Sequence, residues 1–438
     1  MNSNQEKDFS TSESTTENLD NTNIDEINGI NDNNDNNDNN GANDANNTED
    51  TENTDTVEEE QAKEPAVKRK VPLFSKIFLG IAAFCGILYI LFLNIPSFSD
   101  FFNKNISPIV RGALSYLTTW IPFSLAEMLL ILIPVIIVVI VGIGIKKYSD
   151  SWRNVGVFCV IMLSIASYVF STYTLGFVPA YHGSTLDKKM ELDKQKVSAD
   201  ELYETSMILS AELAKESEHI IFNGEGASVM PYGYGELNDK LMEAYEKACE
   251  KYDFISPLHS NIKEVMLSEP MTYTHISGVY TFFTGEANLN VNFPDYVLPY
   301  TAAHEFAHQR GIAREDEANF VAFIVCMESD DHYIRYSAYL NVYEYVANAL
   351  YSADNTQGKS VYSIVYKTLP YGVKTDMAAY SKFFKKYQKT VVSDVSGAVN
   401  DTFLNINGVE EGSKSYGMVV DLAVAYYKNE SNRATDTP

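Results

Sequence analysis

The chain has 438 residues, four cysteines and a formal net charge of −26, and this length has room for more than one folded unit. The region after residue 181 contains no basic patch, which argues against nucleic-acid binding because an acidic surface repels phosphate. Cys249 and Cys326 are the two cysteines outside the apolar segments, and the sequence leaves open whether they are bridged. One bridge at most excludes a disulfide scaffold.

The first 60 residues carry 18 acidic side chains and a single cation, Lys7, so −17 of the total charge of −26 belongs to this segment. Its runs of Asn, Asp, Thr and Glu, such as residues 31–40, contain almost nothing apolar to bury. We therefore expect residues 1–70 to be a disordered acidic tail that acts as a solvated spacer, with an acidic docking segment as the alternative.

Three apolar runs of membrane-spanning length follow, at residues 77–95, 128–145 and 155–175. They predict a membrane region at residues 71–181, with the lipid bilayer as a partner. The first run comes after a long polar tail and is longer than a signal-peptide core, so we interpret it as a retained anchor.

Basic residues around these runs predict the orientation of the chain. They precede the first run and occupy the loop between the second and third, as Lys68, Arg69, Lys70, Lys146, Lys147 and Arg153. Because cytoplasmic loops are enriched in Lys and Arg, we expect a multi-pass protein of the cell membrane with a cytoplasmic N-terminus. Everything after about Gly176 would then lie outside the cytoplasm.

The segment between the first two runs has two features of its own. Residues 107–118 predict a short interfacial helix with Ile109, Leu114 and Leu117 directed at lipid. Glu127 lies near the outer end of the second run, where we expect it to face water or to extend toward the interface.

Residues 182–438 are numerous enough for one outer domain with its own core. Ser198 and Glu201 have capping-box spacing and predict the start of a helix, and residues 236–253 predict a second helix. With the strands proposed below, these patterns predict a mostly α (α+β) fold: three transmembrane helices, then a mainly helical outer domain with a small β-sheet.

The segment from His304 to His308 reads HEFAH and is an HExxH motif. On a helix the two histidines are one turn apart on the same face, so both imidazoles can reach one metal ion. Glu305 lies beside them and can accept a proton from a metal-bound water, which makes it the candidate catalytic base. Gly311 follows the motif closely and predicts that the helix ends there.

Catalytic zinc usually takes three protein ligands and leaves one position for water. The acidic cluster Glu315, Asp316 and Glu317 offers the third ligand. Glu315 shares a helical face with small residues, whereas Glu317 projects about 200° away from it. We therefore predict Glu315 as the ligand. Glu317 is the alternative, and otherwise a surface ion-pair partner of Arg310 or Arg314.

The predicted centre thus holds one Zn²⁺ ion between His304, His308 and Glu315, although other divalent metals suit the same ligand types. Asn319 comes one turn after Glu315. We expect it to hydrogen-bond a ligand histidine and so to fix the tautomer of that imidazole.

Residues 304–320 resemble the gluzincin-type zinc peptidases, in which HExxH is followed by E-x-x-A-D or E-x-x-A-N, here Glu315 to Asn319. The same residues, with residues 121–127 and 285–288, resemble a family of bacterial membrane proteins of uncharacterised function, DUF3810. The resemblance implies a zincin-like peptidase domain. One departure is Arg310, because a hydrophobic residue commonly occupies that position in the peptidases.

Residues 279–283 and 287–291 alternate in character and predict two strands joined by a turn. Zinc peptidases commonly present an edge strand beside the metal helix, to which the substrate backbone adds as a further strand. We hypothesise that residues 287–291 fill this role, with the substrate bound along Ala287, Asn288 and Leu289. The alternative is an ordinary structural hairpin.

Five tyrosines follow the motif on one helical segment, and their spacing favours a core role: Tyr333, Tyr336, Tyr339, Tyr343 and Tyr345. One of them could also stabilise the oxyanion in a peptidase.

The sequence as a whole predicts a membrane-anchored zinc metallopeptidase that cleaves a peptide or cell-wall peptide outside the membrane. The alternative is a non-catalytic, zinc-stabilised envelope module for binding or signalling. Glu305 argues against that alternative, because a structural zinc site needs no general base. A transporter is disfavoured because three spans with a single acidic residue among them offer little for an ion pathway.

Overall fold

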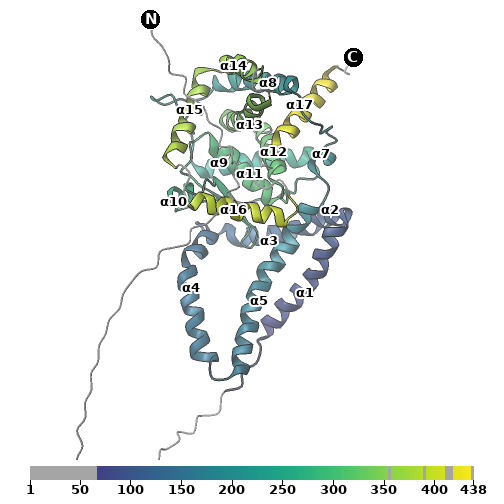
Figure 1. Cartoon of the computed structure of the whole chain (residues 1–438), viewed down its shortest axis with the longest axis vertical. Coiled ribbons are helices and arrows are strands. Elements are labelled where there is room, and N and C mark those ends of the chain that lie inside the picture. The colour runs from purple at the N-terminus through teal and green to yellow at the C-terminus, as the bar shows by residue number, and fades with distance from the viewer. Residues whose placement is uncertain (1–66, 354–356, 388–390, 410–417, 436–438) are drawn as a thin grey trace, which may run out of the picture. The chain divides into compact units, whose positions relative to one another are not determined.

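The computed structural model of the protein describes residues 67–353, 357–387, 391–409 and 418–435. Residues 65–438 form one compact unit. The described part is mostly helical with one three-stranded sheet, as the sequence predicted (Figure 1). The expected acidic tail falls, up to residue 66, outside the described residues.

Three helices are long and apolar enough to cross a membrane: α1 (Leu73–Asn94), α4 (Leu125–Tyr148) and α5 (Trp152–Gly176). Each contains one of the predicted apolar runs, which indicates a membrane-associated protein. All three extend from the same end of the helical domain (Figure 1). α1 packs against α5, whereas no residue of α4 is buried, as expected for a helix that is apolar on all sides and surrounded by lipid.

Two short helices connect α1 to α4, namely α2 (Pro96–Asn105) and α3 (Ser107–Thr119). α3 buries its polar face, which consists of Ser107, Arg111, Ser115 and Thr118. Its apolar residues Ile109 and Leu117 are 70% and 69% exposed. The predicted amphipathic helix is therefore present with its apolar side outward, except that Leu114 is partly buried.

The helical domain is built around α11 (Val297–Gln309) and α12 (Glu315–Met327), which are buried along almost their whole length. α12 is surrounded by α9 (Tyr234–Lys251), α13 (His332–Ala353) and α17 (Val419–Thr435). The remaining helices are α6 (Val178–His182), α7 (Leu186–Lys189), α8 (Ala199–Ser217), α10 (Ser268–Thr272), α14 (Gln357–Thr368), α15 (Tyr371–Lys386) and α16 (Val391–Ile406).

A local sequence signal explains where α8 begins. At the start of α8 the Ser198 hydroxyl accepts the backbone N–H of Glu201, and the Glu201 carboxylate accepts that of Ser198, which completes the predicted capping box.

Cys249 of α9 and Cys326 of α12 are both free thiols. Three of the α13 tyrosines are at most 3% exposed and belong to the core, namely Tyr333, Tyr336 and Tyr343.

The sheet contains β1 (Ile262–Glu264), β2 (Gly278–Thr281) and β3 (Glu286–Leu289) in the order β1-β3-β2. β3 runs parallel to β1 and antiparallel to β2. The β2–β3 hairpin was predicted, and Gly285 in its turn has a φ of +74°, a conformation that glycine adopts without steric cost.

The hypothesis that residues 287–291 form an edge strand is wrong. Ala287, Asn288 and Leu289 pair with β1 on one side and with β2 on the other, and all three are buried. A central strand has no free backbone edge to which a substrate could add. The three residues of β1 are too few to show a strand period in the sequence, so the neighbour that makes β3 central was not recognised.

Glu344 of α13 provides a pH-dependent contribution to stability. Burial raises the pKa of this carboxyl to about 8, and Tyr296 donates a hydrogen bond to it at 3.4 Å. Its contribution to stability is fully present below the unfolded pKa of about 4.3 and is lost as the pH rises toward 8. We expect Glu344→Gln to raise the midpoint of thermal unfolding at pH 8.5, by roughly 2–4 °C for each kcal/mol that burying the charged carboxylate costs, and to leave it unchanged at pH 4. An equal shift at both pH values would contradict this.

Candidate metal centre

α11 and the turn after it bring the HExxH residues and Glu315 together. His304 and His308 lie one turn apart on α11, which ends at Gln309. Gly311 has a φ of +90°, so the chain reverses within five residues and α12 starts at Glu315. The side chain of Glu315 therefore lies opposite the two imidazoles, and all three groups are buried.

The distances within this cluster suit a metal ion. Glu315 Oε2 lies 3.1 Å from His304 Nε2 and 3.3 Å from His308 Nε2. Two ligand atoms of a tetrahedral zinc ion, each bound at about 2.05 Å, are about 3.4 Å apart. Among the described residues, this is the one group of three His, Cys, Asp or Glu side chains whose ligand atoms lie within 4.8 Å of one another. The donor set and its spacing fit a divalent cation.

The charges of the three side chains also suit a divalent cation. Burial opposes the charge of Glu315, but His308 and His304 outweigh it and hold the pKa of this carboxyl well below its usual range. Burial also opposes the charge of His308, yet Glu315 raises the pKa of that imidazole to about 9. A divalent cation held by both imidazoles needs them neutral, so its binding would replace protons as the partners of Glu315.

The His308 imidazole has a partner that orients it. His308 Nδ1 donates to the carbonyl oxygen of Ile312 at 2.8 Å, which leaves Nε2 facing Glu315. Asn319 interacts with the His304 ring and with the Tyr345 side chain, whereas His304 Nδ1 is buried without a hydrogen-bond partner among the described residues. Asn319 thus lies beside His304, and the hydrogen bond that would fix the tautomer of His304 stays a prediction. The sequence did not predict the involvement of Tyr345 as a neighbour of Asn319.

Glu305 is directed at the edge strand β2. A Cβ atom at Gly278 would lie 2.5 Å from Glu305 Oε1 and 2.7 Å from Cγ, so any larger residue there would displace this side chain. The backbone of Tyr280 hydrogen-bonds the carboxylate, and burial raises the pKa of Glu305 to about 8. Oε2 is buried and has no hydrogen-bond partner among the described residues. The role of Gly278 cannot be seen in the sequence, because this glycine directly precedes the predicted strand at residues 279–283 and becomes the first residue of β2.

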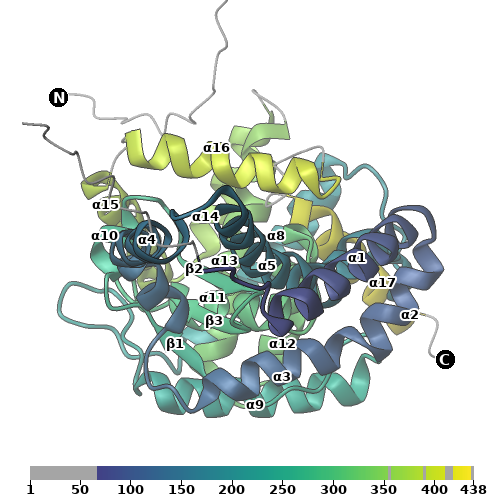
Figure 2. The same ribbon diagram turned by 90° about the horizontal axis from the view of Figure 1, so that it is seen from below.

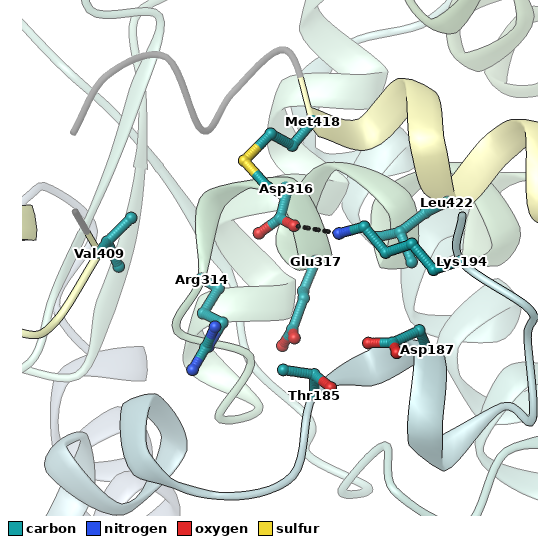
Figure 3. A pocket seen from close by; sticks show the side chains of 9 residues that line it. All are labelled: Thr185, Asp187, Lys194, Arg314, Asp316, Glu317, Val409, Met418 and Leu422. Atoms are coloured by element: carbon teal, nitrogen blue, oxygen red, sulfur yellow. Dashed lines mark hydrogen bonds and ion pairs between the residues drawn. The ribbon is translucent and has the colours of Figure 1, made fainter. Parts of the chain in front are cut away.

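Glu317 does not reach the histidines. Its side chain extends toward Thr185 (Figure 3), and its Oε1 accepts the backbone N–H of Leu186 at 2.9 Å. The neighbouring Asp316 pairs with Lys194 at 3.4 Å. Glu317 is buried, so the expected surface ion pair with Arg310 or Arg314 is wrong.

Arg310 is also buried, with its guanidinium 3.8 Å from the centre of the Tyr245 ring and a hydrogen bond to the Phe306 carbonyl. Stacking on the tyrosine ring stabilises this buried cation.

Helices near the membrane hold the end of α11 in place. Arg111 of α3 is buried and donates to the carbonyl oxygens of Gly176 at 2.7 Å and of Arg310 at 3.2 Å. Asn103 of α2 donates to the carbonyl oxygen of Gly311 at 3.0 Å. Gln309 donates to Ser115 of α3 at 3.1 Å. The histidine helix is therefore bound directly to the segments that join the membrane helices.

A second connection joins α4 to the sheet. The Glu286 carboxylate of β3 accepts the backbone N–H groups of Leu125 and Ala126, at 3.0 and 2.9 Å, in the first turn of α4. Glu127 in turn accepts the N–H groups of Met266 and Leu267 at 2.8 and 2.7 Å. Glu127 is partly exposed, so it can face water as predicted, and these two hydrogen bonds are partners that the sequence did not show. Carboxylates stabilise free N–H groups at helix starts, and both acids have this role.

The fold and this cluster define a membrane-associated, mainly helical protein with a candidate divalent-metal centre. Residues 102–424 match the protein family described as "Protein of unknown function (DUF3810)". This match covers more than half of the chain, and the chain belongs to the DUF3810 family. The matched region starts in α2 and ends in α17, so it includes the whole candidate centre. Comparison with curated proteins and with solved structures found no match.

Proposed function

We propose that this protein is a membrane-anchored zinc metallopeptidase of the gluzincin type with a zincin-like helical domain. The observation that carries the proposal is the convergence of His304 Nε2, His308 Nε2 and Glu315 Oε2 beside Glu305, whose Oε2 lacks a partner among the described residues. Zinc held by these three ligands would polarise the scissile carbonyl and activate a water molecule. One ligand position would remain open for that water.

The chain's own residues supply the other parts of the reaction. Glu305 accepts the proton of the attacking water and passes it to the leaving amine nitrogen. Its raised pKa and its partly unsatisfied carboxylate suit a group that alternates between the two protonation states. Gly278 leaves the space that this side chain occupies.

β2 is the candidate strand for binding the substrate backbone. It is at the edge of the sheet, and α11 packs against it. The N–H of Asn290 donates to the carbonyl of Ser277, and the alternation of an antiparallel ladder then directs the backbone groups of Gly278 and Tyr280 outward. The Tyr280 backbone already hydrogen-bonds Glu305 on this side, and a peptide could add along the rest of the edge. In the described part of the chain no strand pairs with it.

The proposed orientation has the helical domain outside the cytoplasm. Arg69, just before α1, donates its backbone N–H to Asn154 at the start of α5, and its side chain donates to the Lys147 carbonyl. The basic residues that precede α1 and those at the adjoining ends of α4 and α5 therefore lie together, at the end of the spans remote from the domain (Figure 1). Positive charge at one end favours that end as cytoplasmic.

One observation favours the non-catalytic alternative, a zinc-stabilised envelope module that binds a ligand and signals through its spans. The membrane-proximal helices hydrogen-bond the end of the histidine helix, so a change at the metal could be transmitted to them. The place of Glu305 beside the candidate metal ligands, with its Oε2 unpaired among the described residues, favours the peptidase instead. A signalling site does not need a general base.

The experiment that tests the proposal is metal analysis of the full-length protein, purified in detergent, with the matched variants Glu315→Gln and Glu317→Gln. Glutamine keeps the shape of both side chains and can still accept the Leu186 N–H at position 317. We expect about one zinc per wild-type chain, a loss of affinity of about 100-fold or more in Glu315→Gln, and normal zinc in Glu317→Gln. Folded wild-type protein without zinc, or equal zinc in both variants, would disprove the centre.

A further inference from the structure

α16 exposes an apolar stripe along one side. Five of its side chains are between 53% and 80% exposed: Val391, Val392, Val395, Val399 and Ile406. At 100° per residue, all five fall within an arc of about 100° on the helix surface, which also contains the exposed Thr402. Exposed valines scattered singly are common, but five large apolar residues on one side of a 16-residue helix mark a surface that contacts something apolar.

The opposite face of α16 is fixed to the protein, so the stripe points away from it. Leu404 is fully buried, and the Phe403 ring lies 6.2 Å from that of Tyr173 and 6.3 Å from that of Tyr181. Tyr173 also donates a hydrogen bond to Asn407, immediately after α16. These contacts determine which way α16 faces.

The same contacts place α16 at the membrane end of the domain. Tyr173 belongs to the last turn of α5, so its partner Phe403 lies at the level where α5 leaves the apolar layer. Figure 1 shows α16 crossing the base of the domain at the height of α3, above α4 and α5. Seen from the membrane end, α3 and α16 lie on opposite sides of the spans (Figure 2).

α3 provides a precedent at this level. It buries polar residues and exposes Ile109, Leu117 and, just after its end, Trp120, which is 76% exposed. Tryptophan at this depth is typical of the membrane–water interface. The exposed apolar surfaces of α3 and α16 therefore lie at the same height as the ends of the spans that join the helical domain.

We propose that α16 is an interfacial helix whose valine stripe is inserted in the lipid leaflet on the side of the helical domain. The bilayer contacts this surface, because the stripe lies at the same height as the ends of the spans and the exposed side of α3. The acids Asp394 and Asp401 lie more than about 100° from the centre of the stripe, where they can remain in water. Amphipathic helices in this position bury their apolar face in the boundary between headgroups and acyl chains. This inference does not depend on the proposed peptidase activity.

Spin labels on the full-length protein in phospholipid nanodiscs test the proposal. The four native cysteines are replaced by alanine, and single labels are attached to Val395→Cys and Val399→Cys in the stripe. Asp394→Cys is the matched control on the polar flank, and Val135→Cys reports a lipid-exposed position of α4. The measured quantity is collision of each label with oxygen, which concentrates in lipid, and with a water-soluble nickel complex.

We expect the stripe labels to collide several-fold more with oxygen than with nickel, as the Val135 label does, and the Asp394 label to show the reverse. Stripe labels that are as accessible to nickel as the Asp394 label would overturn the proposal. Stripe labels shielded from both reagents would also overturn it, because a protein surface would then cover the valines.

A second measurement avoids the cysteine-free background in case that chain does not fold. Val399→Trp is introduced into the otherwise native protein, and its fluorescence is quenched by lipids brominated on their acyl chains. Quenching beyond that of the parental protein supports insertion. Quenching equal to that of the parent, with full fluorescence of the added tryptophan, contradicts it.

Discussion

Replacing Glu305 by glutamine should lower peptide hydrolysis by roughly 10²–10⁴-fold, which is the usual contribution of a general base, while the zinc content stays the same. Glutamine fills the space beside Gly278 and can still accept the hydrogen bond from the Tyr280 backbone. It cannot take a proton from the attacking water. The measurement is cleavage of a fluorescein-labelled casein by the full-length protein in detergent, together with metal analysis of the same samples.

Glu317→Gln is the matched control for this prediction, since it makes the same chemical change in a buried glutamate that does not face the metal cluster. It should hydrolyse casein like the wild type. Undiminished hydrolysis by Glu305→Gln would refute the proposed mechanism. Wild-type protein that holds zinc but cleaves no peptide would instead favour the non-catalytic alternative.

The features that the sequence predicted are those encoded by short, regular patterns. The spans follow from apolar runs, α8 from its capping box, and the cluster from the one-turn spacing of His304 and His308 with the helical phase of Glu315. In each case the physical cause acts over a few consecutive residues, so the pattern is visible without knowledge of the fold.

The features that were missed depend on partners distant in sequence. The sequence predicts an edge strand at β3 because its neighbour β1 has three residues and no recognisable period. The hydrogen bonds of Glu127 with the N–H groups of Met266 and Leu267, 139 and 140 residues later, likewise depend on the fold and cannot be seen in the sequence. The stripe on α16 was present as valines four residues apart, but its exposure depends on which face Leu404 buries.

Gly311 has one role that a local sequence pattern shows and a second role that depends on a partner distant in sequence. Its position after the motif predicted the end of α11, and its φ of +90° agrees with that. The structure adds a second reason, since a Cβ atom there would lie between 2.5 and 2.7 Å from three atoms of the Arg111 guanidinium. Arg111 is buried, and burial lowers its pKa to about 10, yet it stays close to the Gly176 and Arg310 carbonyls that accept its hydrogen bonds.

We therefore expect Gly311→Ala to destabilise the protein through both causes. An alanine at positive φ costs on the order of 1 kcal/mol, and displacing Arg111 leaves buried carbonyls unsatisfied at about 1–3 kcal/mol each. The sum is about 3–7 kcal/mol. Because Gly311 is three residues from His308, zinc affinity should fall as well. The measurements are thermal unfolding of the full-length protein in detergent and zinc titration.

A double-mutant cycle with Arg111→Met separates the two causes. Methionine has no donor for the carbonyls of Gly176 and Arg310, so this variant alone already loses the hydrogen bonds of the guanidinium. In its background Gly311→Ala should cost only the backbone term of about 1 kcal/mol, which gives a coupling of roughly 2–6 kcal/mol between the two positions. If Gly311→Ala cost as much in the Arg111→Met background as in the wild type, the contact with α3 would be irrelevant, and the glycine would serve the turn alone. The predicted coupling instead makes the connection to the membrane-proximal helices part of what holds His308 in position.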